Sequence, residues 1–347
     1  MDSSAQIAQS ITRYLVSPGP NAARHEAAAT VAELQLQAKR APRFVAEITG
    51  LAQAAELAQQ VPVFVLDRAK WASEVGRFTD SLIAWTGQQQ VRRAGQVAIG
   101  SVLSFAATKV LGQFDPFADL LGQTILADAS VDLAASVATK DAAHSGVSAK
   151  TESLDAAAKL MLVAPNIAKF RNEYDLDRRD LALWVSVHEL THAVQFIHAK
   201  WLRGYLLERM QCALSLGEAD EDELLSAEIE KIQNVMSILE GHAQYVMNAL
   251  PIAVLPSRDA IIKALAEKRK GSSWLQRKLT KVLGFERKIA QYRRGEDFTQ
   301  YVVANAGMEV FNKIWEGAAN LPDNDEFAQP QLWIERMKHT ARIGSEA

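Results

Sequence analysis

The residues best suited to chemistry lie in the stretch HELTHAVQFIH, residues 188–198. His188 and His192 are four residues apart, so on a helix their side chains project from one face, about 40° apart around the axis, and can share one metal ion. Glu189 follows the first His and can reach a metal-bound water without binding the metal itself, as a general base must. The pattern predicts a zinc site with two His ligands and a glutamate base.

A further histidine, His198, stands where one large class of zinc proteases has its last ligand, after a glycine that turns the chain back to the metal. This chain has Gln195 at the position of that glycine, and no Gly or Pro lies between His192 and Arg203. The helix is therefore expected to continue, which puts His198 about 100° of rotation away from the midpoint of the first two ligands. We expect His198 to point away from the metal.

The third ligand is expected from a second helix, which contains LEGHAQYVMN, residues 239–248. Glu240 is the preferred ligand, because the residues around it do not resemble a water-facing surface. His242 is turned by about 200° from Glu240, so both cannot face the metal from one helix, and His242 remains the alternative. Three ligands would leave the fourth position of a tetrahedral zinc for water.

The two His residues are expected on a long helix. Asp177 is a suitable N-cap and Asp180 puts a favourable charge in the first turn, so the helix should run from there to about Arg203. A second long helix is predicted from about Asp222 to Leu250, stopped by Pro251. The acidic segment GEADEDE before it would let this helix fold back against the first.

Two short β-branched runs are the strands expected in this chain: PVFVLDR from Pro62, and KLMLVAPNI from Lys159, which should stop at the Pro165-Asn166 turn. The second run precedes the metal-binding helix by one loop, as the substrate-pairing edge strand does in zinc proteases. The most apolar stretch, VAIGSVLSFAATKVL from Val97, contains a lysine and is shorter than the roughly 20 residues that cross a bilayer, so it predicts a buried helix. These patterns indicate a mainly α fold with a small β-sheet, the α+β class.

Length and composition describe a globular chain of one large domain or two ordinary ones. The chain has 347 residues, of which 48% are apolar, enough for a substantial core. The polar, aperiodic stretch TKDAAHSGVSAKTES, residues 139–153, is the best candidate for a boundary. We expect a helical N-terminal region over residues 1–150 and the metal-binding region over residues 151–347, which could form one compact unit.

Charge and cysteine content limit the partners and the location. The net charge of -3 gives the protein no overall positive potential that would attract nucleic acid. The segment 258–294 has twelve basic residues, but three acidic residues lie among them, as on a solvated helix face. No nucleic-acid or membrane partner is expected, and nothing specifies an oligomeric state. The single Cys212 excludes an internal disulfide framework, and the N-terminus lacks a secretory signal pattern, so a cytoplasmic location is predicted.

Several segments resemble the zincin-like metallopeptidase family of actinobacteria and relatives. They are HELTHAVQF, EGHAQYVM, LGQFDPFA at residues 111–118, expected to be helical, LMLVAPNI, and RKIAQYRRGEDFTQYVVANAGMEVFNKIWEG near the C-terminus. The resemblance runs from LVSPGP near residue 15 to QLWIERM near residue 337. That family is often associated with biosynthesis of a deazaflavin coenzyme, although no residue here indicates a flavin or nucleotide site.

The resemblance implies a zincin-like fold of the gluzincin type, in which HExxH is followed by a downstream Glu. The Zn²⁺ ligands that it implies are His188, His192 and Glu240, with Glu189 as the base. Glutamate helices of this kind often carry an Asp shortly after the ligand, where it can hydrogen-bond a ligand His. This chain has Gln244 and Asn248 instead, and a neutral amide raises the basicity of an imidazole less than a carboxylate does.

The predicted function is a zinc-dependent hydrolase, and within that class a metallopeptidase that acts on a peptide or protein substrate. Glu189 would take the proton of the attacking water and return it to the leaving amine. The side chains with suitable chemistry to stabilise the oxyanion are those of Tyr245, His242, Tyr292 and Arg293. The alternative is a catalytically weak or inactive zinc-stabilised scaffold; Glu189 favours the hydrolase, since a structural zinc site needs no base.

Overall fold

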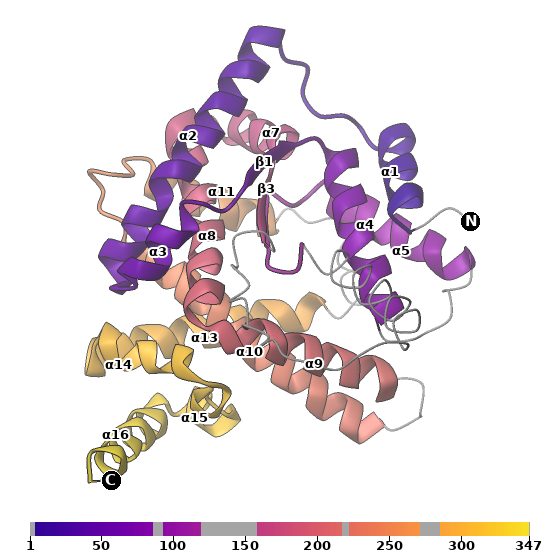
Figure 1. Ribbon diagram of the computed structural model, residues 1–347. Helices are drawn as coiled ribbons and strands as arrows, with labels where there is room; N and C mark the ends of the chain where they lie inside the picture. The colour runs from indigo at the N-terminus through magenta and orange to yellow at the C-terminus, as the bar shows by residue number, and fades with distance from the viewer. Residues whose placement is uncertain (1–3, 86–92, 119–157, 217–221, 271–284, 347) are drawn as a thin grey trace, which may run out of the picture. The chain divides into compact units, whose positions relative to one another are not determined.

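The fold is taken from a computed structural model, in which residues 4–85, 93–118, 158–216, 222–270 and 285–346 are described (Figure 1). The chain forms two compact units, and each unit is assembled from two segments that are distant in the sequence. Unit 1 comprises residues 1–19 and 61–166, and unit 2 comprises residues 20–60 and 167–347. The boundary expected at residues 150 and 151 lies outside the described residues.

Unit 1 contains a small mixed sheet. In the described part of the chain the strands form one three-stranded sheet in the order β1-β3-β2. Strand β1 (Val63–Leu66) is parallel to β3 (Lys159–Val163), and β2 (Gly112–Asp115) is antiparallel to β3. The residues of β3 from Leu160 to Val163 are at most 1% exposed, which explains its uninterrupted apolar run. Both strands expected from the sequence, and the mainly helical class with a small sheet, are confirmed.

Three details of the sheet differ from the sequence-based expectations. Residues 112–115 were expected to be helical, but they pair with β3, because pairing partners distant in the sequence outweigh a weak local preference. Strand β3 is central and not an edge strand, so its backbone groups are already paired on both sides. Pro165 does not form a turn; it lies in the first turn of α7 (Ala164–Tyr174), where its missing N–H removes no helical hydrogen bond.

Helices α1 (Ser4–Leu15), α4 (Arg68–Trp85) and α5 (Arg93–Ala106) pack against one another in unit 1. The helix expected in the apolar stretch from Val97 is α5, but only one of its faces is buried. Ser104 is buried against α1 and its hydroxyl lies 2.9 Å from that of Thr12, whereas Val102 is 38% exposed. No helix of the described segments is long and apolar enough to cross a membrane.

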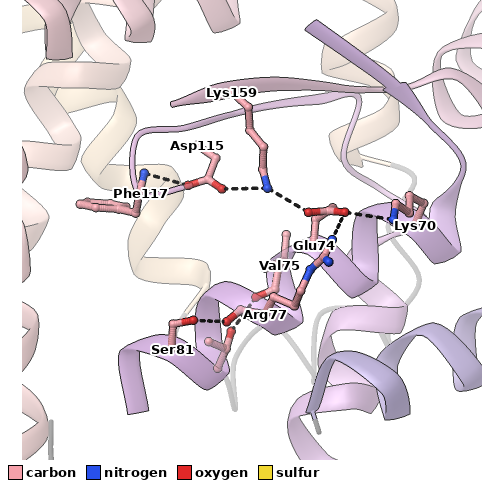
Figure 2. A network of polar contacts seen from close by, with 9 residues as sticks. Lys70, Glu74, Val75, Arg77, Ser81, Asp115, Phe117 and Lys159 are labelled. Carbon is pink, nitrogen blue, oxygen red and sulfur yellow. Dashed lines mark hydrogen bonds and ion pairs between the residues drawn. The ribbon is translucent and has the colours of Figure 1, made fainter. Parts of the chain in front are cut away.

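A charged network joins α4 to the sheet of unit 1 (Figure 2). Lys159, at the start of β3, lies between two carboxylates, with its Nζ 2.9 Å from Glu74 and 3.7 Å from Asp115. Burial raises the pKa of Asp115. Burial also acts to raise the pKa of Glu74, but Lys159, Arg77 and Lys70 together lower it below its ordinary value. Lys159 is therefore the cation on which both carboxylates depend.

Lys159→Met should destabilise unit 1 by about 1–3 kcal/mol at pH 7, because it leaves two largely buried carboxylates without their shared cation. Loss of the cation raises the folded-state pKa of both carboxyls, so the folded variant takes up protons as the pH falls. The difference in unfolding free energy from wild type should therefore shrink between pH 7 and pH 5. Chemical denaturation at both pH values measures it. Lys70→Met is the control, since the Lys70 side chain is 51% exposed; a difference that grows towards pH 5 would contradict this account.

Unit 2 is built around α8 (Arg178–His198), against which α2 (Arg24–Thr49), α3 (Ala52–Ala58) and α10 (Asp222–Ala249) pack. Asp177 caps α8 as predicted, since its side chain accepts a hydrogen bond from the backbone N–H of Asp180. The expected continuation to about Arg203 is wrong. Ala199 leaves the helical conformation (φ -88°, ψ 75°) and α9 (Lys200–Leu216) begins immediately after it.

The second long helix predicted by the sequence is α10, and its bounds are confirmed to within one residue. It packs along α13 (Phe285–Ala306), and the two backbones nearly touch at a pair of glycines. A Cβ on Gly241 would lie 2.2 Å from the carbonyl carbon of Gly295, and a Cβ on Gly295 would lie 1.8 Å from the carbonyl oxygen of Ser237. Only glycine permits this approach, which fixes the rotation of α10 next to Glu240.

Among the described residues of unit 2, the remaining helices follow α10 in the sequence. They are α11 (Arg258–Lys270), α14 (Met308–Asn312), η2 (Lys313–Glu316), η3 (Ala318–Asn320), α15 (Asn324–Ala328) and α16 (Pro330–Glu346).

Candidate metal centre

Three candidate ligands from two helices of unit 2 lie together. His188 and His192, on one face of α8, meet Glu240 of α10, and one ligand atom from each lies within 4.8 Å of the others. The Nε2 atom of His188 is 3.6 Å from Oε2 of Glu240, and Nε2 of His192 is 3.8 Å from Oε1. Each carboxylate oxygen thus faces one imidazole.

These distances fit a shared metal ion better than direct hydrogen bonds. A charge-assisted hydrogen bond between nitrogen and a carboxylate oxygen is about 2.7–2.9 Å long. Ligand atoms at about 2.0–2.1 Å from a tetrahedral zinc are about 3.4 Å apart, close to the separations between Glu240 and the two rings. Two imidazoles and one carboxylate are also a donor set that zinc accepts while keeping a fourth position open.

The electrostatics around His188 favour the neutral imidazole, which is the form that binds a metal. Burial lowers the pKa of His188 to about 4; the charge of Glu240 acts in the opposite direction and His192 in the same direction. His188 is therefore unprotonated at neutral pH, and its ring does not have to lose a proton for a metal to bind. The His188 and Glu240 side chains are 30% and 24% exposed, so solvent reaches this face of unit 2.

Glu189 lies on α8 between the two histidines in sequence. It is three residues before His192, a spacing at which side chains are neighbours on a helix surface. Its exposed fraction is 8%. Glu189 is thus a largely buried carboxylate beside the candidate ligands.

His198 is exposed and is the last residue of α8, outside the cluster of candidate ligands. Helix α8 ends at His198, because Ala199 leaves the helical conformation. His198 nevertheless does not join His188 and His192 in the cluster. The expectation that His198 points away therefore agrees with the structure, although the helix is shorter than expected.

Gln195 is the residue of this site that the sequence reasoning missed. Its Oε1 is 2.9 Å from Nδ1 of His192, and its Nε2 donates to the carbonyl oxygen of Leu239 at 2.9 Å. The same Nε2 is 3.0 Å from Nδ1 of His242. The available signal was its position three residues after His192, on the same helix face.

His242, the alternative ligand, is not among the three residues of the cluster. It is fully buried, and its ring packs against Phe311 and Trp315 with centroid distances of 5.2 Å and 5.3 Å. Burial lowers the pKa of His242 to about 3, with a smaller contribution from His192, so the ring is neutral at physiological pH.

The amides expected to substitute for an orienting Asp point elsewhere. Gln244 donates to Asn248 at 3.0 Å, and Asn248 donates to Glu296 on α13 at 3.0 Å. The amide in contact with His192 is that of Gln195 on α8, and not that of Gln244 or Asn248 on α10. Among the candidates for stabilising an oxyanion, the side chains of Tyr292 and Arg293 lie outside the described residues.

Comparisons with known proteins bear on the fold and the family of this chain. A crystal structure from Chloroflexus aurantiacus, described as a candidate hydrolase with a novel fold, is similar over 96% of this chain and 97% of its own, with 24% identity and a TM-score of 0.63. At that identity the similarity establishes a shared fold. No protein among those with curated descriptions matches the chain. The sequence model of the zincin-like metallopeptidases matches residues 4–227 and 215–334, nearly the whole length. The chain therefore belongs to the zincin-like metallopeptidase family.

Proposed function

We propose that this protein is a zinc-dependent peptidase of the gluzincin type, in which His188, His192 and Glu240 bind the metal and Glu189 is the general base. The observation that carries the proposal is the convergence of three ligand atoms from two helices within 4.8 Å, beside an intact HExxH sequence. The family membership supports the reaction class. A substrate with a peptide bond follows from that class.

Each residue has a distinct part in the proposed reaction. Bound zinc would supply Lewis acidity, which polarises the scissile carbonyl and lowers the pKa of a water molecule to about 7. The Glu189 carboxylate accepts the proton of the attacking water and passes it to the leaving amine nitrogen. Glu240 contributes the negative charge that two neutral imidazoles lack, and the partial exposure of His188 and Glu240 leaves a path for substrate.

A zinc-stabilised scaffold without turnover is the second candidate. A metal held by residues of α8 and α10 would join two long helices of unit 2, which is a structural role in itself. The position of Glu189 favours the peptidase, because a purely structural site has no use for a carboxylate at that point of α8. Substitution of Glu189 distinguishes the two functions.

Metal analysis of ligand variants tests the proposed site. Purified wild-type protein should contain about one zinc per chain, and His188→Ala and His192→Ala should lose it on dialysis, because a site with two remaining ligands binds weakly. His198→Ala is the matched control from the same helix and should retain the metal. Elemental analysis measures all four proteins. Zinc retained in both ligand variants, or lost in the control, would exclude the proposed ligand set.

A further inference from the structure

Gln195 occupies the point where the two ligand-bearing helices meet. It is fully buried on α8, three residues after His192. Its amide contacts the ring of His192 and, across the helix interface, the carbonyl of Leu239, the residue directly before Glu240. One side chain therefore connects one candidate ligand to the backbone that carries another.

The Leu239 contact determines which way round the amide lies. A backbone carbonyl oxygen only accepts hydrogen bonds, so the group that faces it must be the NH₂ of Gln195. The carbonyl oxygen of the amide then faces Nδ1 of His192, at 2.9 Å. A flipped amide would put two oxygens together at Leu239 in a buried site, with no hydrogen between them.

The orientation of the amide in turn selects the tautomer of His192. An amide oxygen accepts hydrogen bonds, so Nδ1 of His192 must carry the proton and donate it to Gln195. Nε2 then keeps its lone pair, and Nε2 is the atom that lies 3.8 Å from Glu240 in the cluster. The metal-binding tautomer is thus present before any metal arrives.

His242 completes the arrangement. The Nε2 atom of Gln195 lies 3.0 Å from Nδ1 of His242 and donates its second N–H to that atom. Nδ1 of His242 is therefore the acceptor, and the ring carries its proton on Nε2. The Nε2 atom of His242 has no hydrogen-bond partner in the described part of the chain, so the ring is held by packing on Phe311 and Trp315. His242 thereby occupies the remaining donor of the amide and keeps it from turning.

We propose that Gln195 is a positioning residue of the metal centre, which holds His192 in its Nδ1-protonated tautomer and ties that ring to α10 beside Glu240. The inference rests on the proposed metal site. It assigns a function to the position at which the other class of zinc proteases has its turning glycine. It also explains how a neutral amide on α8 can orient His192, since Gln244 and Asn248 of α10 hydrogen-bond elsewhere.

The test combines zinc affinity with the tautomer of the histidines in metal-free protein. Gln195→Leu removes all three contacts of the amide, and zinc affinity measured by chelator competition should fall about 10- to 100-fold, as for other residues that orient a metal ligand. Histidine-selective ¹⁵N spectra should show His192 changing from one tautomer to a mixture. Gln37→Leu is the matched control: Gln37 is also a buried glutamine of unit 2, bonded to Glu33, and its loss should leave both readouts unchanged.

Gln195→Glu provides a second variant in case Gln195→Leu does not fold. A carboxylate still accepts from His192 but cannot donate to His242 or Leu239, so His192 should keep its tautomer while His242 moves its proton to Nδ1. Zinc affinity should fall less than in Gln195→Leu. An unchanged His192 tautomer in Gln195→Leu, or an unchanged His242 tautomer in Gln195→Glu, would overturn the inference.

The tautomer measurements also separate this inference from the proposed function. They are made without metal, so they report on the contact between Gln195 and His192 even if wild-type protein binds no zinc, a result that would exclude the peptidase proposal but not the tautomer assignment. If wild type binds zinc and Gln195→Leu binds it equally tightly, the proposed function stands and the positioning function of Gln195 is excluded.

Discussion

Glu240→Ala should lower the zinc affinity of the protein by more than about 100-fold. Loss of a residue that only hydrogen-bonds a metal ligand typically lowers the affinity about 10- to 100-fold, and loss of a ligand itself should lower it further. Removal of Glu240 takes away the one anionic donor of the cluster and leaves two neutral imidazoles, a set that binds zinc weakly. Isothermal titration or chelator competition with purified metal-free protein gives the affinity directly.

His242→Phe is the matched comparison for Glu240→Ala. It replaces the alternative ligand on the same helix with a ring that can keep the packing against Phe311 and Trp315. Its effect on zinc should be far smaller, limited to the loss of one contact with Gln195. If His242→Phe lost more zinc than Glu240→Ala, the gluzincin assignment would fail and His242 would become the preferred third ligand.

Glu189→Gln should abolish peptide hydrolysis while zinc content stays close to that of wild type. An amide keeps the size of the side chain but cannot accept the proton of the attacking water, and loss of a general base typically costs about 10²- to 10⁴-fold in rate. Cleavage of a mixed peptide library, followed by mass spectrometry, measures activity whichever peptide sequence the enzyme prefers. Zinc content is determined on the same samples.

Glu208→Gln is a suitable control for the glutamate substitution, since the Glu208 side chain is 63% exposed on α9. It should leave cleavage unchanged. Equal cleavage by Glu189→Gln and wild type would show that Glu189 is not the base. A wild-type protein that binds zinc but cleaves no peptide in the library would favour the scaffold.

Local patterns were sufficient to predict the helices that carry the site. The Asp177 cap and the apolar periodicity placed the start of α8, and α10 was predicted to within one residue, because caps and helical periodicity act over a few neighbouring residues. The common face of His188 and His192 follows from helix geometry alone. The sequence patterns and the family resemblance together indicated the mainly helical class with a small sheet.

The choice between Glu240 and His242 was only partly accessible from the sequence. Helix geometry established that both cannot face one metal, and the neighbours of Glu240 favoured it. What brings Glu240 to the histidine pair is the rotation of α10, which depends on the contact between Gly241 and Gly295 of α13. Neither glycine has a local sequence pattern that predicts this contact between α10 and α13.

Only the tertiary structure decided the features that depend on distant partners. The residues of β2 form a strand because β3 pairs with them, and the same pairing makes β3 central rather than an edge. The amide of Gln195 orients His192 because Leu239 and His242, on another helix, receive its two N–H groups. In each case a hydrogen bond in a buried site outweighs the small local conformational preferences of the residues involved. Such a bond cannot be predicted from the local sequence, because its partners become neighbours only in the folded chain.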